Sequence, residues 1–330
     1  MQKVRWGILS TAKIGREKVI PAMQKGEFCA VVAIASRNID AANAEAKKLN
    51  IAKAYGSYEE LLQDKEIDAG YIPLPNDMHV EWAMKCLEAD KHVLCEKPIG
   101  LTSQQAQQLL DAAKQKPHLK VMEAFMYRFH PQWKYAKKLV DDKVIGDVKT
   151  IQSFFSYYNI DPNNIRNKKE AGGGGMMDIG CYCVSFARFI FSNEPEKVFG
   201  LLEFDPQLQT DRIASGILDF TKVTSTFTCS TQLFTYQRVN ILGTEGRIEI
   251  QIPFNAPPDS QTEIWHHSKA GPGKIVFDPV DQYTLQGDTF SKCILENTDV
   301  PFGLEDAVNN MKVIEAIFKI SDEGKWITIK

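Results

Sequence analysis

The sequence predicts an α/β protein: an N-terminal domain with a doubly wound parallel sheet, followed by an α+β domain with a large, mostly antiparallel sheet. Three observations support this fold class. Apolar runs alternate with amphipathic helical segments up to residue 125, and after it alternating runs are separated by short turns. The length of 330 residues also exceeds what one core usually fills, so we expect two domains, 1–125 and 126–330.

The first domain is predicted as buried strands that alternate with helices. Continuous apolar strands separated by amphipathic helices are typical of a parallel sheet covered on both faces. Ser57 and Glu60 have the spacing of a helix capping box. Strands are expected at 4–9, 29–36, 69–74, 92–95 and 121–125, and helices at 14–24, 40–49, 57–64, 77–89 and 103–114.

The second domain is predicted as a sheet with few helices, and its last helix is a candidate to pack back on the first domain. Residues 255–285 are the hardest to interpret, and we expect His266 and His267 to lie there in a surface loop. A hairpin turn is expected at 243–246. Strands are expected at 148–158, 197–204, 214–220, 225–233, 238–242, 247–252 and 326–329, and helices at 177–191 and 304–321.

Composition favours a small molecule as the partner. The 39 basic and 42 acidic residues give a net charge of −3 without a long run of either sign, which argues against nucleic acid or membrane binding. The sequence has neither a signal-peptide pattern nor an apolar stretch of about 18 residues. Its seven cysteines lie mostly in apolar segments, so we expect a cytoplasmic protein with reduced core cysteines and no bound metal.

The turn after the first strand is a candidate dinucleotide-binding turn. Ser10, Ala12 and Gly15 fill the three glycine slots of the G-x-G-x-x-G fingerprint. Small residues let the backbone approach a pyrophosphate, and the following helix N-terminus supplies N–H donors. The alternative is an ordinary strand–helix turn. The order strand, turn, helix favours a Rossmann site, with Thr11 and Ile14 as further contacts.

The end of the second strand favours NADP over NAD. An acid about 20 residues after the fingerprint binds the ribose of NAD, but here Ser36 and Arg37 occupy this place. A guanidinium pairs well with a phosphate. The alternatives are a solvent-facing arginine and the use of NAD. The fifth strand ends in Glu96-Lys97-Pro98, which topology places at the ligand-binding edge of the sheet.

Four segments together resemble the Gfo/Idh/MocA family of oxidoreductases over essentially the whole chain. Within that family the similarity is greatest to the dimeric dihydrodiol dehydrogenases and the NADP-dependent D-xylose dehydrogenases. The segments are Glu96-Lys97-Pro98, Pro75-Asn76 with His79, Glu123 to Pro131, and Gly172 to Tyr182.

The resemblance implies a catalytic set of Lys97, Asp178 and Tyr182. Arg128 follows the last strand of the first domain at the same edge of the sheet, so it is a candidate substrate contact; the alternative is that it packs between the domains. The cofactor contacts that the resemblance adds are Leu74, Pro75, Asn76, His79, Glu96 and Lys97. The alternative for His79 is a helix N-terminal histidine in water. Many family members have histidine where this chain has Tyr182, which points away from the inositol dehydrogenase branch.

The implied chemistry agrees with the residue types. Asp178 and Tyr182 lie four residues apart, so they share one face of a helix. Oxidation of an alcohol removes a proton from oxygen while hydride leaves carbon. Tyr182 can accept that proton if a cation such as Lys97 lowers its pKa, and Lys97 can also stabilise the alkoxide. The alternative for Tyr182 is an ordinary core tyrosine.

The leading hypothesis is NADP-linked oxidation of an aldose or a trans-dihydrodiol, or reduction of a dicarbonyl sugar. A non-catalytic NADP-binding regulator and an NAD-dependent glycoside-cleaving enzyme are the alternatives. We expect residues 155–170 and 230–285 to set substrate specificity. We also expect a homodimer or homotetramer formed through the antiparallel sheet, because Phe227 and Leu233 alternate there with Thr and Ser.

Overall fold

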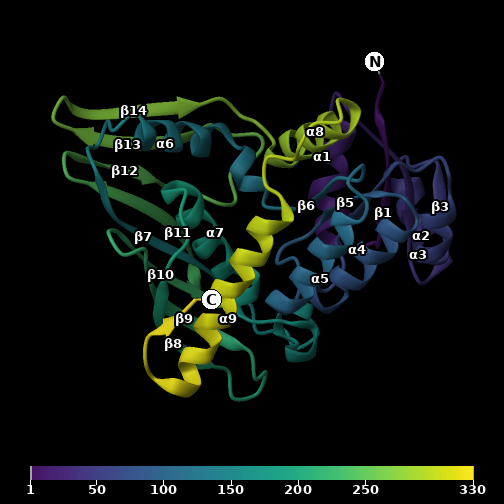
Figure 1. Ribbon diagram of the computed structural model, residues 1–330. Helices are drawn as coiled ribbons and strands as arrows, with labels where there is room; N and C mark the ends of the chain where they lie inside the picture. Colours follow the sequence, from purple (N-terminus) through teal and green to yellow (C-terminus); the bar gives the residue numbers. More distant parts are fainter. Residues whose placement is uncertain (1, 330) are drawn as a thin grey trace. The chain divides into compact units, whose positions relative to one another are not determined.

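The computed structural model describes residues 2–329, apart from the side chains of residues 321–323. The chain forms two compact units, Met1–Met126 with Gln282–Val308, and Tyr127–Asp281 with Asn309–Lys330 (Figure 1). The first unit contains a six-stranded sheet and the second a nine-stranded sheet. The fold class predicted from the sequence is confirmed.

The sheet of the first unit is parallel throughout, in the order β3-β2-β1-β4-β5-β6. The connection order reverses between β1 and β4, which is where sheets of this order bind dinucleotides. Its strands are β1 (Val4–Leu9), β2 (Cys29–Ala35), β3 (Lys53–Tyr55), β4 (Ala69–Ile72), β5 (His92–Cys95) and β6 (Val121–Glu123). The sequence pattern missed β3 because three half-buried residues show no periodicity.

Helices cover both faces of this sheet. On β1, Gly7 faces α3 so closely that an added Cβ would lie 2.7 Å from Leu61, whereas the neighbouring Trp6 contacts Phe290 of α8 on the other face. The helices of this unit are the π turn η1 (Gly15–Val19), α1 (Ile20–Gln24), α2 (Ile39–Lys48), α3 (Tyr58–Gln63), α4 (His79–Glu88), α5 (Ser103–Lys114), α8 (Gln282–Leu295) and the start of α9 (Leu304–Glu323).

Helix α8 returns to the first unit from far along the chain and lies beside α1 (Figure 1). Trp6 Nε1 donates to Ser291 Oγ over 3.1 Å, and Thr284 Oγ1 donates to the carbonyl oxygen of Ala22 over 2.9 Å. The Asp288 carboxylate accepts the backbone N–H groups of Glu27 and Phe28. These bonds fasten α8 to β1, α1 and the loop before β2.

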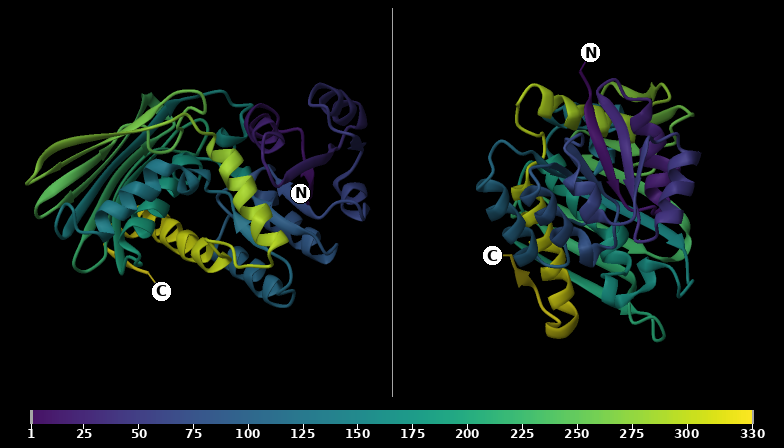
Figure 2. Two further views of the ribbon diagram at one scale, coloured as in Figure 1. Left: turned by 90° about the horizontal axis from the view of Figure 1, so that it is seen from above. Right: turned by 90° about the vertical axis from the view of Figure 1, so that its right-hand side faces the viewer.

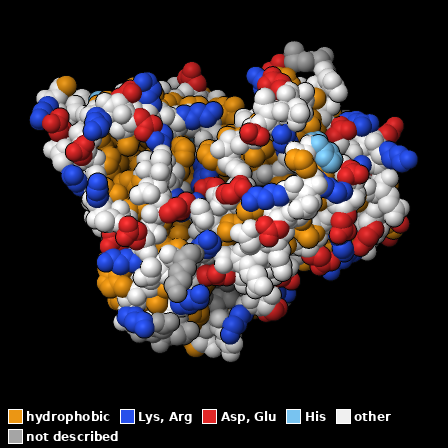
Figure 3. Space-filling view, in the orientation of Figure 1, with side chains coloured by type: hydrophobic (Ala, Val, Ile, Leu, Met, Phe, Trp, Pro, Cys, Tyr) orange, Lys and Arg blue, Asp and Glu red, His pale blue; other side chains and the backbone are white. Residues whose placement is uncertain are grey.

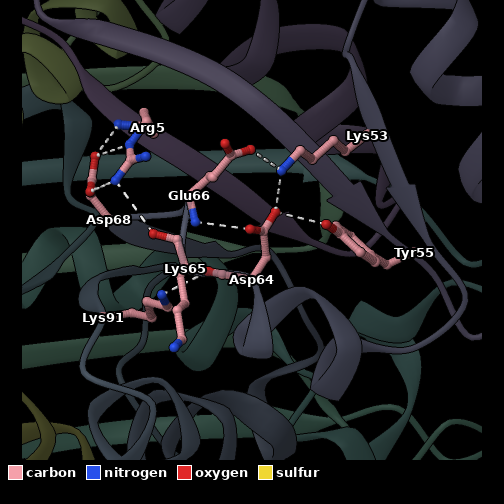
Figure 4. A network of polar contacts seen from close by, with 8 residues as sticks. All are labelled: Arg5, Lys53, Tyr55, Asp64, Lys65, Glu66, Asp68 and Lys91. Atoms are coloured by element: carbon pink, nitrogen blue, oxygen red, sulfur yellow. Dashed lines mark hydrogen bonds and ion pairs between the residues drawn. The ribbon is translucent and has the colours of Figure 1, made fainter.

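An ion-pair network joins β1 and β3 to residues 64–68, which precede β4 (Figure 4). Arg5 on β1 binds Asp68 just before β4, with Nη2 2.6 Å from Oδ1. Lys53 and Tyr55 on β3 both donate to Asp64 over 2.7 Å, and the lysine lowers the pKa of that carboxyl to about 2. The charges of this network are therefore paired within the protein itself.

The sheet of the second unit is antiparallel except for the parallel pair β7–β10, in the order β14-β13-β12-β11-β7-β10-β9-β8-β15. Its strands are β7 (Val148–Tyr158), β8 (Lys197–Phe204), β9 (Asp211–Asp219), β10 (Thr224–Ser230), β11 (Gln232–Gly243), β12 (Gly246–Ile250), β13 (Thr262–Ser268), β14 (Gly271–Phe277) and β15 (Ile327–Thr328). Helix α6 (Pro131–Asp141), the π turn η6 (Met176–Gly180) and α7 (Cys181–Phe191) pack on one face of it (Figure 2).

One prediction for the second unit was wrong, and one helix was missed. His266 and His267 do not lie in a loop but in β13, which pairs with β12 and β14. The Pro, Gly and polar residues around this hairpin hid its alternation, in which Thr262 and Ile264 are buried and their neighbours are half-buried. Helix α6 was also not predicted, although His130 caps it and Pro131 occupies its first turn.

All seven cysteines are buried thiols. Between residues 2 and 329 no helix is both long and apolar enough to span a bilayer. On the face seen in Figure 3, acidic and basic side chains are interspersed rather than gathered into patches of one sign.

Candidate active site

The candidate cofactor residues all follow strands at the carboxyl edge of the six-stranded sheet. Ser10 follows β1, Ser36 follows β2, Leu74 comes two residues after β4, and Lys97 comes two residues after β5. β1 pairs with β2 and β4, and β4 pairs with β5. The strand order therefore brings these residues to one edge of the sheet, although Ser10 and Lys97 are 87 positions apart in the sequence.

The turn after β1 is tighter than its residues suggest. Ser10 has φ 138, a region that glycine enters freely and other residues rarely adopt. This is the first glycine slot of the dinucleotide fingerprint. The Ser10 hydroxyl accepts the N–H of Ala12 over 2.8 Å, which stabilises the turn. The helix then begins with the π turn η1, where Arg16 Nε donates to the carbonyl oxygen of Thr11 over 2.7 Å.

The end of β2 presents a polar pair. Ser36 is buried, and its hydroxyl accepts the N–H of Asn38 over 3.3 Å. Arg37 is exposed and lies beside Tyr58 at the start of α3. Burial raises the pKa of the Tyr58 hydroxyl, and the positive charge of Arg37 opposes that shift. An exposed cation at this position, where an NAD enzyme has an acid, suits an additional phosphate group.

Lys97 lies between two anchored neighbours. Glu96 accepts a 2.6 Å hydrogen bond from the hydroxyl of Tyr71 on β4. On the other side, the N–H of Ile99 donates to Glu123 Oε1 on β6 over 2.7 Å, and the Lys97–Pro98 peptide bond is cis. The backbone around the lysine is thereby tied to both strands that neighbour β5.

His79 is a buried link between two turns of this edge. Its side chain is 1 % exposed, so the alternative of a histidine in water is wrong. Nδ1 lies 2.7 Å from the carbonyl oxygen of Pro98, and Nε2 lies 2.8 Å from that of Leu74. Burial lowers the pKa of the ring. Both nitrogens contact backbone, which joins the Leu74–Asn76 turn to the Lys97 turn; a direct cofactor contact of His79 stays a prediction.

Asp178 in the second unit binds two residues that sequence reasoning missed. The hydroxyl of Tyr157 on β7 donates to Asp178 Oδ2 over 2.6 Å, and Arg166 Nε donates to Oδ1 over 3.1 Å. Both donors lie within the segment 155–170 that we expected to set specificity. No motif marks them, because the loop that carries Arg166 has no periodic pattern.

The charges of this cluster stabilise one another. The carboxylate of Asp178 raises the pKa of Arg166, with smaller contributions from Tyr157 and Tyr182. Burial raises the pKa of Tyr157, and Asp178 raises it further. Tyr157 therefore stays a neutral donor and Arg166 a cation, so both donate to the same carboxylate.

A second carboxyl group caps the helix that carries this cluster. Asp211 Oδ2 accepts the N–H of Met176 over 2.6 Å, and its side chain is 1 % exposed. Gly174 has φ 116, and a Cβ there would lie 2.0 Å from Asp211 Oδ1. Burial raises the pKa of Asp211 to about 7. The glycines after residue 171 thus make room for a carboxyl group of the chain itself.

Tyr182 and Arg128 are both buried. The Tyr182 ring packs between Phe155 and Phe254, at centroid distances of 5.8 and 5.4 Å. Arg128 is 3 % exposed, and its Nη2 donates to Ser185 Oγ of α7 over 2.7 Å. These contacts give Arg128 a role in holding α7 in place, while its contact with substrate stays a prediction.

Two family models match the chain. A model of an oxidoreductase family with an NAD-binding Rossmann fold, GFO_IDH_MocA, matches residues 4–125. The GFO/IDH/MocA C-terminal domain matches residues 133–249.

Curated relatives cover much or all of the chain. An uncharacterized oxidoreductase of Rhizobium meliloti is 41% identical over 100% of both chains. A D-xylose 1-dehydrogenase (NADP(+)) of Haloferax volcanii is 37% identical over 98% of this chain and 99% of its own. A trans-1,2-dihydrobenzene-1,2-diol dehydrogenase of Xenopus laevis is 37% identical over 74% of each.

A solved structure is also similar. The 3-ketoreductase of Actinomadura kijaniata, crystallised with NADP and TDP-benzene, has a TM-score of 0.90 and 26% identity, over 96% of this chain and 97% of its own.

Proposed function

Because the chain belongs to the Gfo/Idh/MocA family of oxidoreductases, we propose that it transfers a hydride between NADP(H) and a CH–OH or carbonyl group of a sugar or cyclic diol. The observation that carries this proposal is the anchored Lys97 turn at the carboxyl edge of the dinucleotide-binding sheet. The names of the Haloferax and Xenopus relatives support an aldose or a trans-dihydrodiol as the alcohol.

The residues of the first unit fit NADP as the cofactor. The turn from Ser10 to Ile14, with a helix N-terminus behind it, suits the pyrophosphate. Ser36 and Arg37 stand where an NAD enzyme has an acid, so they suit the 2′-phosphate. When bound, the nicotinamide supplies or accepts the hydride. The 1–125 segment is the cofactor-binding domain in this proposal, and 126–330 is the substrate and oligomerisation domain.

The residues of the chain handle the proton. We expect Tyr182 to take the proton of the substrate hydroxyl during oxidation and to return it during reduction. Lys97 stabilises the tyrosinate and the developing alkoxide by its positive charge. Both carboxylate oxygens of Asp178 are engaged by Tyr157 and Arg166. We therefore expect Asp178 to position the substrate rather than to accept the proton.

Kinetics of three variants test the proton transfer. Tyr182→Phe and Lys97→Ala should each lower kcat by about 10²–10⁴-fold with NADP affinity little changed, which is the usual size of an acid–base contribution. The double variant should be much less damaged than the product of the two, because the residues act as one unit. A Tyr182→Phe enzyme that keeps more than about a tenth of wild-type kcat would exclude Tyr182 as the base.

A substrate panel tests the reaction class. Pentoses, hexoses, anhydro-sugars and cyclic diols are offered with NADP while NADPH absorbance is followed. Net formation of NADPH is expected with at least one of them. Glycoside cleavage recycles its cofactor within each turnover and gives no net NADPH, so this measurement separates it from a dehydrogenase.

The open face of the nine-stranded sheet supports a homodimer or homotetramer. Phe227 of β10 is buried on the face that carries the helices, whereas Thr226 points to the other face. Thr226 pairs there with Ile217 of β9, which pairs in turn with Phe199 of β8; all three are half-buried. Such a mixed face suits a second copy of the sheet. Light scattering that gives a monomer at micromolar concentration would remove this part of the proposal.

A further inference from the structure

We propose that Arg166 reads two neighbouring hydroxyl groups of the substrate with the terminal amino groups of its guanidinium, and so determines which polyols the enzyme accepts. This inference rests on the proposed function, because it names the chemistry of the substrate that the site of the second unit takes. No family motif of this sequence includes Arg166.

The backbone of Arg166 is held from several sides. It lies in the short turn Ile165–Asn167, where its N–H donates to Asn164 Oδ1 over 3.1 Å. Its carbonyl oxygen accepts the N–H of Gly174 over 2.8 Å. A Cβ on Gly173 would lie 2.4 Å from that same oxygen, so glycine is required for the close approach. The Gly-rich loop therefore fixes the position from which the arginine side chain starts.

The Arg166 side chain is held by a hydrogen bond at Nε, and its two terminal amino groups are available to a ligand. Nε donates to Asp178 Oδ1 over 3.1 Å, and Tyr157 holds the other carboxylate oxygen. Across residues 2–329, neither Nη1 nor Nη2 of Arg166 makes a hydrogen bond, although 42% of the side chain is exposed. A guanidinium is planar, so the bond at Nε also sets the direction of both terminal amino groups. This is an arginine prepared to bind two oxygens at once.

The guanidinium lies next to the proposed base. Asp178 and Tyr182 are one helical turn apart, in η6 and at the start of α7. The charge of Arg166 interacts with Asp178 most strongly and with Tyr182 as well. A hydroxyl bound by Arg166 is therefore close to the hydroxyl that Tyr182 deprotonates, so the recognised groups are neighbours of the reacting carbon.

Charge balance favours a neutral ligand. Asp178 already compensates the positive charge of Arg166, at an ion-pair distance of 3.1 Å. A carboxylate or phosphate on the substrate would compete with Asp178 for that charge, whereas hydroxyl oxygens accept from Nη1 and Nη2 without disturbing the pair. Adjacent hydroxyls of an aldose or diol match the spacing of the guanidinium fork better than a single hydroxyl does.

Pairs of substrates that differ in one hydroxyl test this inference. The pairs are D-xylose with its 2-deoxy analogue, and a trans-cyclohexanediol with cyclohexanol; D-glucuronate serves as the anionic probe. The variants are Arg166→Met and Arg166→Lys. Lys169→Met is the matched control, because it also removes an exposed cation from this loop. Lys169 itself forms no ion pair in the described part of the chain.

Arg166→Met should reduce the preference of kcat/KM for the hydroxyl-bearing partner by about 10- to 150-fold, the effect of a hydrogen bond to a charged group. Arg166→Lys should keep part of this preference, and Lys169→Met should keep all of it. An equal loss in Arg166→Met for both partners of a pair would show that Arg166 only orders Asp178. A preference for glucuronate that disappears in Arg166→Met would show an anion site instead.

Absence of NADPH formation with every substrate would overturn the proposed function but leave Arg166 testable by binding alone. Saturation-transfer NMR with xylitol and with cyclohexanol measures that binding without turnover. Xylitol signals are expected with the wild-type protein and should be strongly reduced with Arg166→Met. Equal xylitol signals from the two proteins would overturn the inference.

Discussion

Two helices of this protein begin at loops of small residues and open with a π turn. They differ in which group of the chain accepts the backbone N–H groups at the start of the helix. At η6 the loop has four consecutive glycines, and the carboxyl group of Asp211 accepts the N–H of Met176. At η1 only Gly15 fills a glycine slot of the fingerprint. In that loop the hydroxyl of Ser10 accepts the N–H of Ala12. Among the described residues, no acidic side chain accepts a backbone N–H of that loop.

The difference shows that glycine content does not identify a phosphate-binding turn. Residues 172–175 look more like such a turn than residues 10–15 do, but Asp211 takes the place at the helix N-terminus where an external anion would bind. The turn after β1 leaves that place to the cofactor in our proposal. What decides the function of such a turn is whether another part of the chain supplies the acceptor.

The largest expected effect is the change in protein stability when Asp211 loses its proton. Its folded-state pKa of about 7 lies above the ordinary value of 3.8, so the folded protein favours the protonated form. The stability that Asp211 contributes is present below pH 4 and is lost as the pH rises through 7. The difference between the two pKa values corresponds to about 4 kcal/mol of folding free energy.

Urea unfolding between pH 4 and pH 8 measures this loss. Asp211→Asn keeps an acceptor for Met176 but does not titrate, so its stability should change less over this range. Parallel curves for the two proteins would mean that the helix N-terminus fully compensates the charge of Asp211, and the capping group would then act as an ordinary anion.

Substitution of Gly174 by alanine tests whether the close approach of the Asp211 carboxyl group requires a residue without a side chain. Gly174→Ala combines φ 116 with a Cβ 2.0 Å from Asp211, so we expect it to cost about 2–4 kcal/mol. Gly175→Ala is the matched control, since its Cβ would come no closer than 3.2 Å and its φ is −63. Thermal unfolding compares the two variants. Equal losses would mean that close approach of Asp211 is not the reason for glycine.

Arg37 tests whether the cofactor supplies the anions in the first unit. Arg37→Ala should weaken NADP binding by about 1.5–3 kcal/mol, the range for hydrogen bonds to charged groups, and leave NAD binding nearly unchanged. Fluorescence titration with each cofactor measures both affinities. Equal losses for the two cofactors would mean that Arg37 only shapes the loop.

Ser10 is expected to give the smallest effect. Ser10→Ala keeps the unusual φ of 138 but loses the bond to Ala12, so it should cost about 1 kcal/mol. Ser10→Gly also loses the bond, but it relieves the backbone and should be at least as stable as Ser10→Ala. Urea unfolding ranks the two variants, and the opposite order would show that the φ of Ser10 carries no strain.

The sequence predicted the parallel sheet well because its strands and helices have clear periods and its motifs have fixed places. Strand β1 has the predicted bounds, and the Ser57 cap forms as the capping box requires, with its hydroxyl accepting the N–H of Glu60 over 3.1 Å. The reciprocal bond differs, since the Glu60 carboxylate accepts from Gly56 rather than from Ser57. The candidate site was less complete, because Tyr157, Arg166 and Asp211 belong to no motif.

The sequence by itself determined most strands and helices of the first unit, and it marked Lys97, Asp178 and Tyr182 by their places in recognisable motifs. Only the tertiary structure decided that α8 packs on β1, where Trp6 and Ser291 are 285 residues apart, and that Arg166 and Asp211 converge on η6. The reason is physical. A periodic pattern records contacts within one helix or strand, whereas a hydrogen bond between distant loops leaves no local trace until the chain has folded.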